Sequence, residues 1–379
     1  MKLSIAVSFL VFYNFHGFVI NSCMRTESEE EQREHLTKRY QQTLINAALG
    51  DTLGMPVEGW TREQIQKYTG GVTEPIQPFF VRDAQGNIIE SDEYGKLPYI
   101  AAGMGLQRGD WTDDTLLAAT TARAIVKAGG LDINTLAKES ALLYQTIKHL
   151  SGPLSASSVF GFTTKDAFEN LLRGVPPEAS ASPGNSKSPG NAPALKMAPV
   201  GLYMYATGKY KEGIEFAEAA GQMTHVDPRS VASGVVQAHA IYTLLHGITK
   251  DAFLQSVVNV CQTVEHSQDK TVTLLDRLRW VLENKNIDEE DAYKELGPGW
   301  AVTRNYPFAL WMFQKYWDNP IEGLVRLVNY GGDSDSTAAI YGALAGARGI
   351  EFPKNWVDTL RDKEELNLLA SEVASFSQQ

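Results

Sequence analysis

Residues 331–349 read GGDSDSTAAIYGALAGARG, a stretch in which an acidic cluster runs directly into an apolar helical pattern. Asp333 and Asp335 are one serine apart, and in an extended or turned segment this step puts both carboxylates on one side. The two glycines in front of Asp333 permit the sharp turn that this arrangement needs. Farther along, Gly342 and Gly346 lie four residues apart among alanines, which predicts a helix surface that another helix approaches very closely.

A second cluster of the same kind lies much earlier in the chain, in GDWTDDT at residues 109–115. Thr112, Asp113 and Asp114 are consecutive, so they do not all point one way along a helix, but they can converge from the turn that precedes one. Helix capping is the alternative, because threonine, serine and aspartate are favoured N-cap residues. Capping needs only one side chain per helix, whereas each cluster offers two carboxylates beside a hydroxyl. We therefore predict one site, built from both clusters, that binds Mg²⁺ or Mn²⁺.

An acidic loop is predicted ahead of the first cluster, in GDTLGMPVEGW at residues 50–60. The preceding residues repeat an apolar position every four residues, which predicts an amphipathic helix that ends at Gly50. Asp51 follows that end directly, and Pro56 excludes a continuous helix to Glu58, so both acids are placed in a loop. A glutamate in such a loop is usually solvated. Beside a metal centre, Glu58 becomes the leading general base or the group that orients a substrate hydroxyl.

Two further loops carry polar groups suited to substrate binding. His225, in the motif THVDPRS, precedes a predicted helix and can contact a phosphate or a ribose. The alternative, which the sequence supports equally, is that Thr224 or Asp227 in this motif caps that helix. Gly190 and Asn191 precede another possible helix, and their backbone N–H groups can face a phosphate.

Composition and pattern place the chain among all-α proteins without nucleic-acid partners. The 379 residues carry a formal charge of −11 and no basic run, which argues against nucleic acid. Cys23 and Cys261 are too few for a disulfide framework or a cysteine-based zinc site. Helical patterns recur along the chain, and alternating strands are scarce. Residues 173–192 contain SPGN twice and are expected to be a loop within one domain, because the clusters on either side of it must meet.

The amino terminus has the features of an export signal. Residues 1–22 begin with a charged end and continue with an apolar stretch interrupted by polar residues, which favours a secretory signal over a permanent membrane span. The segment VINSC ends at Cys23 and resembles a bacterial lipobox, and an acidic tether follows over residues 23–33. We expect a catalytic domain of residues 34–379 outside the cytoplasm, in the periplasm or on the outer surface, with a lipid on Cys23 as its membrane contact. There are two alternatives. The signal can be cleaved without attachment of a lipid, or the start codon is misassigned and lies ahead of a cytoplasmic domain.

Five motifs, in their order along the chain, resemble those of the ADP-ribosylglycohydrolase family: GDTLGMPVEGW, GDWTDDT, GNAPALKMAP, THVDPRS and GGDSDSTAA. The resemblance covers residues 34–349. It implies a single-domain, all-α orthogonal helical bundle with a loop-built cleft that holds two Mg²⁺ or Mn²⁺ ions. It also implies hydrolysis of the glycosidic bond at the distal ribose of ADP-ribose attached to a side chain or a small group.

The resemblance assigns roles to individual residues. The implied metal ligands are Thr112, Asp113, Asp114, Asp333, Asp335 and Ser336. The implied catalytic residue is Glu58, and the implied substrate-binding residues are Asp51, Gly190, Asn191 and His225. Ser336 stands where threonine is common, and both hydroxyls can bind a metal. GNAPALKMAP departs from the commoner GNGAAMR, with Lys196 in place of arginine, so binding of the diphosphate or proximal ribose is expected to differ.

The resemblance also implies a mechanism. The ions bind the 2″ and 3″ hydroxyls of the distal ribose and position a water, while Glu58 assists proton transfer. Two alternatives stay open at this point: a glycohydrolase for another ribosyl or glycosyl substrate outside the cytoplasm, and a non-catalytic ADP-ribose-binding protein. The complete ligand set and the retained Glu58 favour an enzyme over a binding protein.

Overall fold

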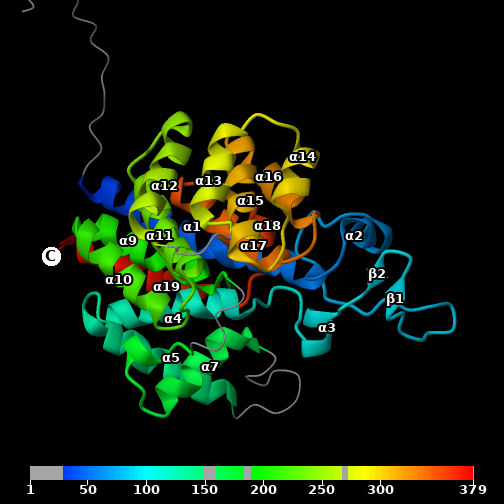
Figure 1. Cartoon of the computed structure of the whole chain (residues 1–379), viewed down its shortest axis with the longest axis horizontal. Helices are drawn as coiled ribbons and strands as arrows, with labels where there is room; N and C mark the ends of the chain where they lie inside the picture. The colour runs from blue at the N-terminus through cyan, green and yellow to red at the C-terminus, as the bar shows by residue number, and fades with distance from the viewer. Residues whose placement is uncertain (1–28, 149–158, 183–188, 267–271, 379) are drawn as a thin grey trace, which may run out of the picture.

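The structure is a computed structural model (Figure 1), and it describes residues 29–148, 159–182, 189–266 and 272–378. The predicted signal of residues 1–22 and the predicted lipid site at Cys23 lie outside the described residues. The first helix, α1 (Glu29–Gly54), begins inside the segment predicted as an acidic tether, so the end of that tether is helical. Among the described residues, no helix combines the length and the apolar character that crossing a membrane requires.

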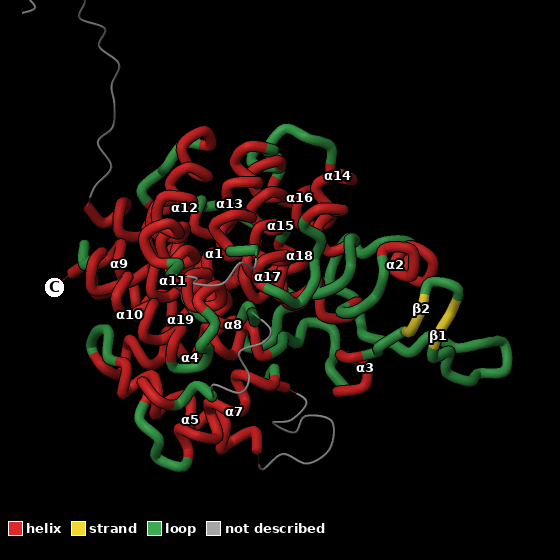
Figure 2. Tube along the Cα trace, viewed as in Figure 1, coloured by secondary structure: helices red, strands yellow, loops and turns green. Residues whose placement is uncertain are grey.

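Helices dominate the described chain, and strands occur in one short hairpin (Figure 2). The longer helices are α1, α4 (Asp113–Ala128), α5 (Ile133–Lys148), α7 (Phe162–Leu172), α9 (Ala198–Thr207), α10 (Tyr210–Gln222), α11 (Pro228–Leu245), α12 (Lys250–Val264), α13 (Leu274–Glu283), α15 (Val302–Lys315), α16 (Pro320–Val328), α17 (Ser334–Ala347) and α19 (Lys363–Ala374). The shorter ones are α2 (Arg62–Thr69), α3 (Ile100–Met104), α8 (Ala192–Leu195), α14 (Glu289–Glu295) and α18 (Lys354–Val357), with 3₁₀ turns η1 (Met55–Val57), η2 (Pro177–Ala179) and η4 (Ser375–Gln378). Strands β1 (Ser91–Asp92) and β2 (Gly95–Lys96) pair antiparallel. The predicted all-α fold is confirmed.

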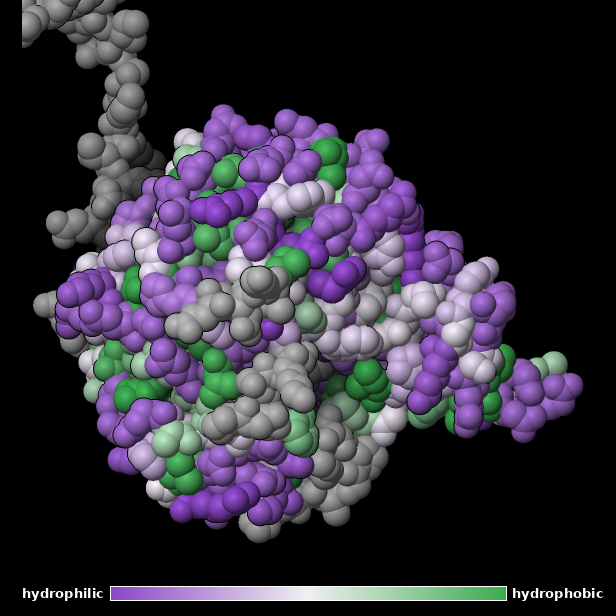
Figure 3. Space-filling view, viewed as in Figure 1, coloured by the Kyte–Doolittle hydropathy of each residue, from purple (hydrophilic) through white to green (hydrophobic). Residues whose placement is uncertain are grey.

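The helices are arranged around α17, which packs along α1 and also contacts α11, α15 and α16. On one side, shown below α11 in Figure 1, α4 packs on α5 and α5 packs on α7. On the opposite side, α12, α13 and α15 pack on one another. Most of the buried apolar side chains of these helices form one continuous core. The outer face seen in Figure 3 is mainly hydrophilic, which agrees with helices that turn one face to the core and one to solvent.

Glycines allow α1 and α17 to pack backbone against backbone. A Cβ added at Gly342 or Gly346 would lie 2.0 Å or 2.2 Å from a backbone carbonyl oxygen of α1. On the other helix, a Cβ at Gly50 would lie 2.1 Å from the carbonyl oxygen of Ala338. The close helix approach predicted from Gly342 and Gly346 is therefore confirmed.

The predicted end of the first helix at Gly50 is wrong, because α1 continues to Gly54. The glycine at position 50 makes room for α17, and it is not among the glycines with positive φ that end helices in this structure. Asp51 therefore lies in the last turn of α1, and its predicted place in a loop is also wrong. The turn η1 follows, and Glu58 comes directly after it, outside the helix as predicted.

Three chain segments converge at one end of the α1–α17 pair. A Cβ at Gly54 would lie 2.4 Å from the backbone nitrogen of Asp335, so the end of α1 touches the start of α17. The segment after Glu58 is joined to the second cluster by two backbone hydrogen bonds, from Gly59 N to Gly332 O at 2.7 Å and from Gly332 N to Trp60 O at 2.9 Å. The start of α4 arrives at the same place through Asp51, as described below.

Candidate metal centre and substrate cleft

The second aspartate cluster lies at the start of α17 with Glu58 beside it. Glu58, Asp333 and Asp335 each offer a carboxylate oxygen, and these three oxygens lie within 4.8 Å of one another. Two side-chain amides hold Asp333, since the Nδ2 atoms of Asn191 and Asn305 each donate to its Oδ2 at 2.7 Å. These contacts fix the Asp333 carboxylate toward Glu58 and Asp335, although no sequence pattern indicated Asn305.

The first cluster opens α4, and it provides both the helix cap and two carboxylates that do not cap the helix. Thr112 is the N-cap of α4, and its hydroxyl accepts a hydrogen bond from the backbone nitrogen of Asp114 at 3.3 Å. The capping interpretation is therefore correct for Thr112, but neither aspartate side chain caps the helix, so both remain candidate metal ligands. Asp114 is buried, and its Oδ2 has no hydrogen-bond partner among the described residues. A buried carboxylate oxygen without a donor indicates a missing partner such as a cation.

Asp51 supports the first cluster from inside α1. Its carboxylate accepts hydrogen bonds from the backbone nitrogens of Thr112, at 2.9 Å for the shorter contact, and Thr115, at 3.2 Å. It also accepts one from the Thr115 hydroxyl at 2.6 Å. Asp51 is fully buried and is not among the residues that line the cleft. We therefore assign it to bracing the start of α4, in place of the substrate contact predicted from the sequence.

The two clusters meet at Ser336, whose side chain offsets part of the rise in the pKa values of both Asp114 and Asp333. All six predicted metal ligands, together with Glu58, line one cleft of about 490 Å³. The structure thus brings the two distant clusters together, as their matching sequence predicted.

Acidic side chains are crowded together in this cleft. Burial is the main cause that raises the pKa of Asp113 to about 7 and the pKa of Glu58 to about 8, and neighbouring carboxylates add to both shifts. Burial also raises the pKa values of Asp114 and Asp335 well above their ordinary range, again with help from nearby aspartates. Hard oxygen donors crowded in this way match the ligand set of Mg²⁺ or Mn²⁺, which would neutralise the repulsion.

The remaining predicted substrate residues lie farther along the same cleft. Gly190, Asn191 and His225 all line it. A Cβ at Gly190 would lie 2.7 Å from Nε2 of His225, so the glycine leaves room for the imidazole. The Asn191 side chain turns to Asp333, a contact that the predicted backbone role did not include.

A buried polar chain lies behind His225. The Lys196 ammonium donates to the Thr224 hydroxyl at 2.8 Å, and that hydroxyl lies 3.0 Å from Nδ1 of His225. Burial, with a smaller effect of Lys196, lowers the pKa of His225 to about 3, so the imidazole is neutral at pH 7. Capping of α11 falls to Asp227, which accepts from the backbone nitrogen of Arg229 at 2.9 Å. His225 is therefore free of a capping role.

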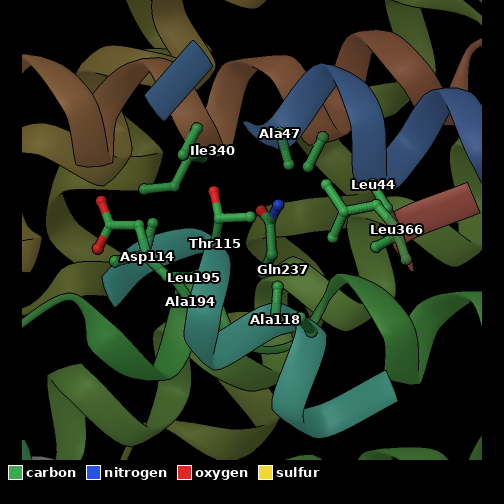
Figure 4. Close-up of a pocket in the computed structure, with 13 residues that line it drawn as sticks. Leu44, Ala47, Asp114, Thr115, Ala118, Ala194, Leu195, Gln237, Ile340 and Leu366 are labelled. Carbon is green, nitrogen blue, oxygen red and sulfur yellow. The ribbon is translucent and has the colours of Figure 1, made fainter. Parts of the chain in front are cut away.

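Behind the first cluster, the interior of the protein is nearly closed. A cavity of about 10 Å³ lies among Asp114, Thr115, Gln237 and apolar side chains of α1, α4 and α17 (Figure 4). A space of this size holds at most about one water molecule. The larger cleft on the other side of Asp114 is therefore the candidate substrate site.

Two residues of the site were not predicted from the sequence. Asn305 directly precedes the apolar run of α15 and is fully buried, but the sequence shows only an amide beside an apolar helical pattern and does not show its burial. Trp300 lies in the loop before α15 and lines the cleft, and its side-chain donor lowers the pKa of Glu58. The glycines and proline around it mark a turn, but nothing local shows which way the ring points.

Comparison with known proteins agrees with this geometry. A model described as ADP-ribosylglycohydrolase matches residues 32–379. The chain belongs to the ADP-ribosylglycohydrolase family. As a member of this family it is a hydrolase that acts on a glycosidic bond, and the family is metal-dependent.

Individual relatives are distant but cover most of the chain. The protein is 26% identical over 339 residues to an uncharacterized protein of Archaeoglobus fulgidus, which covers 89% of this chain and 96% of the relative. It is 22% identical to the ADP-ribosylhydrolase ARH3 of Gallus gallus, over 88% of this chain and 92% of the relative. The ADP-ribosylarginine hydrolase Tri1 of Serratia proteamaculans is 24% identical, over 87% of this chain and 77% of the relative. A solved structure titled as an ADP-ribosylglycohydrolase-related protein complex shares the fold, with a TM-score of 0.61, 24% identity, and coverage of 91% of this chain and 99% of that one.

Proposed function

We propose that this protein is a metal-dependent hydrolase that cleaves the glycosidic bond at the distal ribose of ADP-ribosylated side chains or small ADP-ribose conjugates. The observation that carries the proposal is the group formed by Glu58, Asp333 and Asp335, with ligand oxygens within 4.8 Å inside the 490 Å³ cleft. A cleft of this volume falls in the range that holds small organic ligands. The names of the ARH3 and Tri1 relatives indicate the same class of substrate.

The proposed cofactor is a pair of Mg²⁺ or Mn²⁺ ions. The residues that would hold them are Thr112, Asp113, Asp114, Asp333, Asp335 and Ser336. The unpartnered Asp114 Oδ2 and the crowding of buried carboxylates support this assignment. When bound, such ions orient ribose hydroxyls and stabilise the negative charge that develops on oxygen.

Glu58 is the proposed general base. Its carboxylate takes a proton from the attacking water while the water oxygen bonds to C1″ and the bond from C1″ to the leaving group breaks. Burial keeps the pKa of Glu58 above its ordinary value, and a base whose pKa lies near the working pH transfers protons efficiently. The Trp300 side-chain donor lowers the pKa of the same carboxylate and so favours its ionised form.

The proposed binding groups for the rest of the substrate lie beyond the metal centre. His225 is neutral and faces the cleft beside Gly190, so it can pair with a ribose hydroxyl or a phosphate oxygen without a change of charge. The backbone N–H groups of Gly190 and Asn191, which line the cleft just before α8, are the proposed partners of the diphosphate.

A glycohydrolase for another ribosyl or glycosyl substrate is the second candidate. The observation that favours it is Lys196, whose ammonium is buried on Thr224 at 2.8 Å and whose place is taken by arginine in the motif GNGAAMR. Location outside the cytoplasm, proposed from residues 1–22 and Cys23, favours the same candidate. Fractionation of cells that express the full chain, with and without Cys23→Ala, tests that location.

The test of the main proposal is hydrolysis of a panel of ADP-ribosylated substrates with Mg²⁺, with Mn²⁺ and with a chelator. We expect release of ADP-ribose that depends on metal, and the substrate that turns over identifies the leaving group. Glu58→Gln is the matched control, because it keeps the size of the side chain and should lower kcat about 10²- to 10⁴-fold. Failure of every substrate while metal still binds would overturn the proposal and favour a different sugar substrate.

A further inference from the structure

Trp300 combines exposure with a contact at the centre of the cleft. It is the only one of the seven tryptophans, all of them described, that is counted among the exposed large apolar side chains, with 59% of its surface exposed. It nevertheless lines the cleft together with Glu58. The Trp300 side chain also acts as a donor that lowers the pKa of Glu58, and tryptophan has a single such donor, the indole N–H.

The loop that carries Trp300 is fixed to the site on both sides. The backbone nitrogen of Asp333 donates to Pro298 O at 2.7 Å, and the backbone nitrogen of Val302 donates to Pro189 O at 2.8 Å. A Cβ at Gly332 would lie 2.0 Å from the same Pro298 oxygen. The loop therefore lies directly on the second aspartate cluster, and Trp300 is exposed because it borders an open cleft.

The arrangement leaves a large apolar ring facing the space that a substrate would fill. Phe162, at the start of α7, lines the same cleft and is 66% exposed. Large apolar side chains that are exposed inside a cleft commonly become buried when a ligand binds. Aromatic faces also stack on sugars and bases, and such stacking contributes to affinity in proteins that bind single-stranded nucleic acid.

We propose that Trp300 is a positioning residue: its N–H holds Glu58 in the reacting orientation, and its ring is the wall against which the substrate lies. This inference rests on the proposed function. The two parts of Trp300 then contribute separately: the N–H affects turnover through Glu58, whereas the ring affects substrate binding directly.

Two substitutions at this position separate the contributions. Trp300→Phe keeps an aromatic ring and removes the donor, so we expect kcat to fall about 10- to 100-fold, the range expected for loss of a hydrogen bond to a charged group, while KM stays within about twofold. Trp300→Ala removes both, so KM should also rise by about tenfold or more. Trp280→Phe, at a half-buried site on α13, is the matched control and should leave both constants unchanged.

Binding of ADP-ribose gives a readout that does not depend on turnover. We expect titration with ADP-ribose, in the presence of Mg²⁺, to change the tryptophan emission of the wild type and of Trp280→Phe. The change should be lost in Trp300→Phe although calorimetry still shows binding. Thermal melts check that each variant is folded, and the exposure of Trp300 makes a folding defect an unexpected result.

The outcomes distinguish this inference from the proposed function. If the wild type hydrolyses ADP-ribosylated substrates but Trp300→Phe and Trp300→Ala match it in kcat and KM, the function stands and the role of Trp300 is wrong. If the wild type hydrolyses none of them, the proposed function fails, and the emission titration alone decides the role of the ring. An emission change that persists in Trp300→Phe overturns that role.

Discussion

The two aspartate clusters occupy the N-termini of two helices, yet the protein supports them differently. The second cluster is held by side-chain amides of Asn191 and Asn305 and by backbone contacts at Gly332. The first cluster depends on one buried carboxylate, Asp51, which organises the start of α4. Its own Asp114 keeps an oxygen without a hydrogen-bond partner among the described residues.

From this difference we infer that the protein itself holds the second cluster in place, whereas the first cluster keeps a carboxylate oxygen that a bound cation would engage. Amide donors on Asp333 stabilise its ionised form and fix its direction before any ligand binds. Ser336 favours the ionised form of Asp114, whereas burial and three other aspartates oppose it. The second cluster is thus expected to determine affinity for the metal, and the first cluster is expected to change most when metal binds.

The largest expected effect comes from Asp335→Asn. This change removes a charge from the group of three carboxylates around Glu58, so we expect loss of metal binding and a fall in kcat of at least about 10³-fold, equal to several kcal/mol of transition-state stabilisation. Calorimetry with Mg²⁺ and Mn²⁺, followed by turnover assays, measures both. An Asp335→Asn protein with full activity would show that the second cluster is wrongly assigned.

The next largest effect is expected on stability, when the hydrogen bonds that Asp51 accepts from the first cluster are removed. Asp51→Ala leaves two backbone N–H groups and the Thr115 hydroxyl without their acceptor, so the free energy of unfolding should fall by about 3 kcal/mol or more. Denaturation in saturating Mg²⁺ measures it. Asp132→Ala is the control, because this exposed carboxylate accepts hydrogen bonds from the backbone nitrogen and the hydroxyl of Thr135 at the start of α5, and its loss should cost about 1 kcal/mol from lost capping. Equal losses in the two variants would mean that Asp51 is only a cap.

A smaller effect is expected for Asn305→Ala in the second cluster. The change leaves Asp333 with one amide donor in place of two, and loss of such support typically lowers metal affinity about 10- to 100-fold. Asn191→Ala should lower the affinity less, because Asn191 is half-buried and water can replace its amide. Calorimetric titration with Mn²⁺ compares the two variants. Unchanged affinity in Asn305→Ala would show that the backbone alone orients Asp333.

The smallest expected effect is a dependence of stability on pH. Without metal, burial raises the pKa of Asp113 to about 7 and of Glu58 to about 8, whereas the unfolded values lie near 4. The folded protein then binds more protons between about pH 4 and pH 8, so its stability falls as the pH rises through this window. Mg²⁺ needs ionised ligands, so it should raise Tm by roughly 4 °C near saturation at pH 8 and by less at pH 5.5.

Thermal melts at pH 5.5 and pH 8, with Mg²⁺ and with a chelator, measure this difference. In Asp335→Asn the rise in Tm with Mg²⁺ should disappear at both pH values. A larger effect of Mg²⁺ at pH 5.5 than at pH 8 would contradict the assignment of these carboxylates as ligands.

Local patterns were sufficient to predict the all-α fold, the close approach of helices at Gly342 and Gly346, and the acidic clusters at helix starts. Each of these depends on neighbours in the chain or on periodic spacing, which a sequence displays directly. The prediction that the first helix ends at Gly50 failed because the sequence does not distinguish a glycine that ends a helix from one that makes room for a neighbouring helix.

Tertiary structure alone decided how distant side chains support the site. The amide of Asn305 on Asp333, the brace from Asp51 to the start of α4 and the contact of Trp300 with Glu58 each join residues far apart in sequence. No local pattern encodes them, since each depends on the crossing of α1 with α17 and on where the loop before α15 comes to lie. The sequence thus determined which chemistry is available, and packing determined which groups hold it in place.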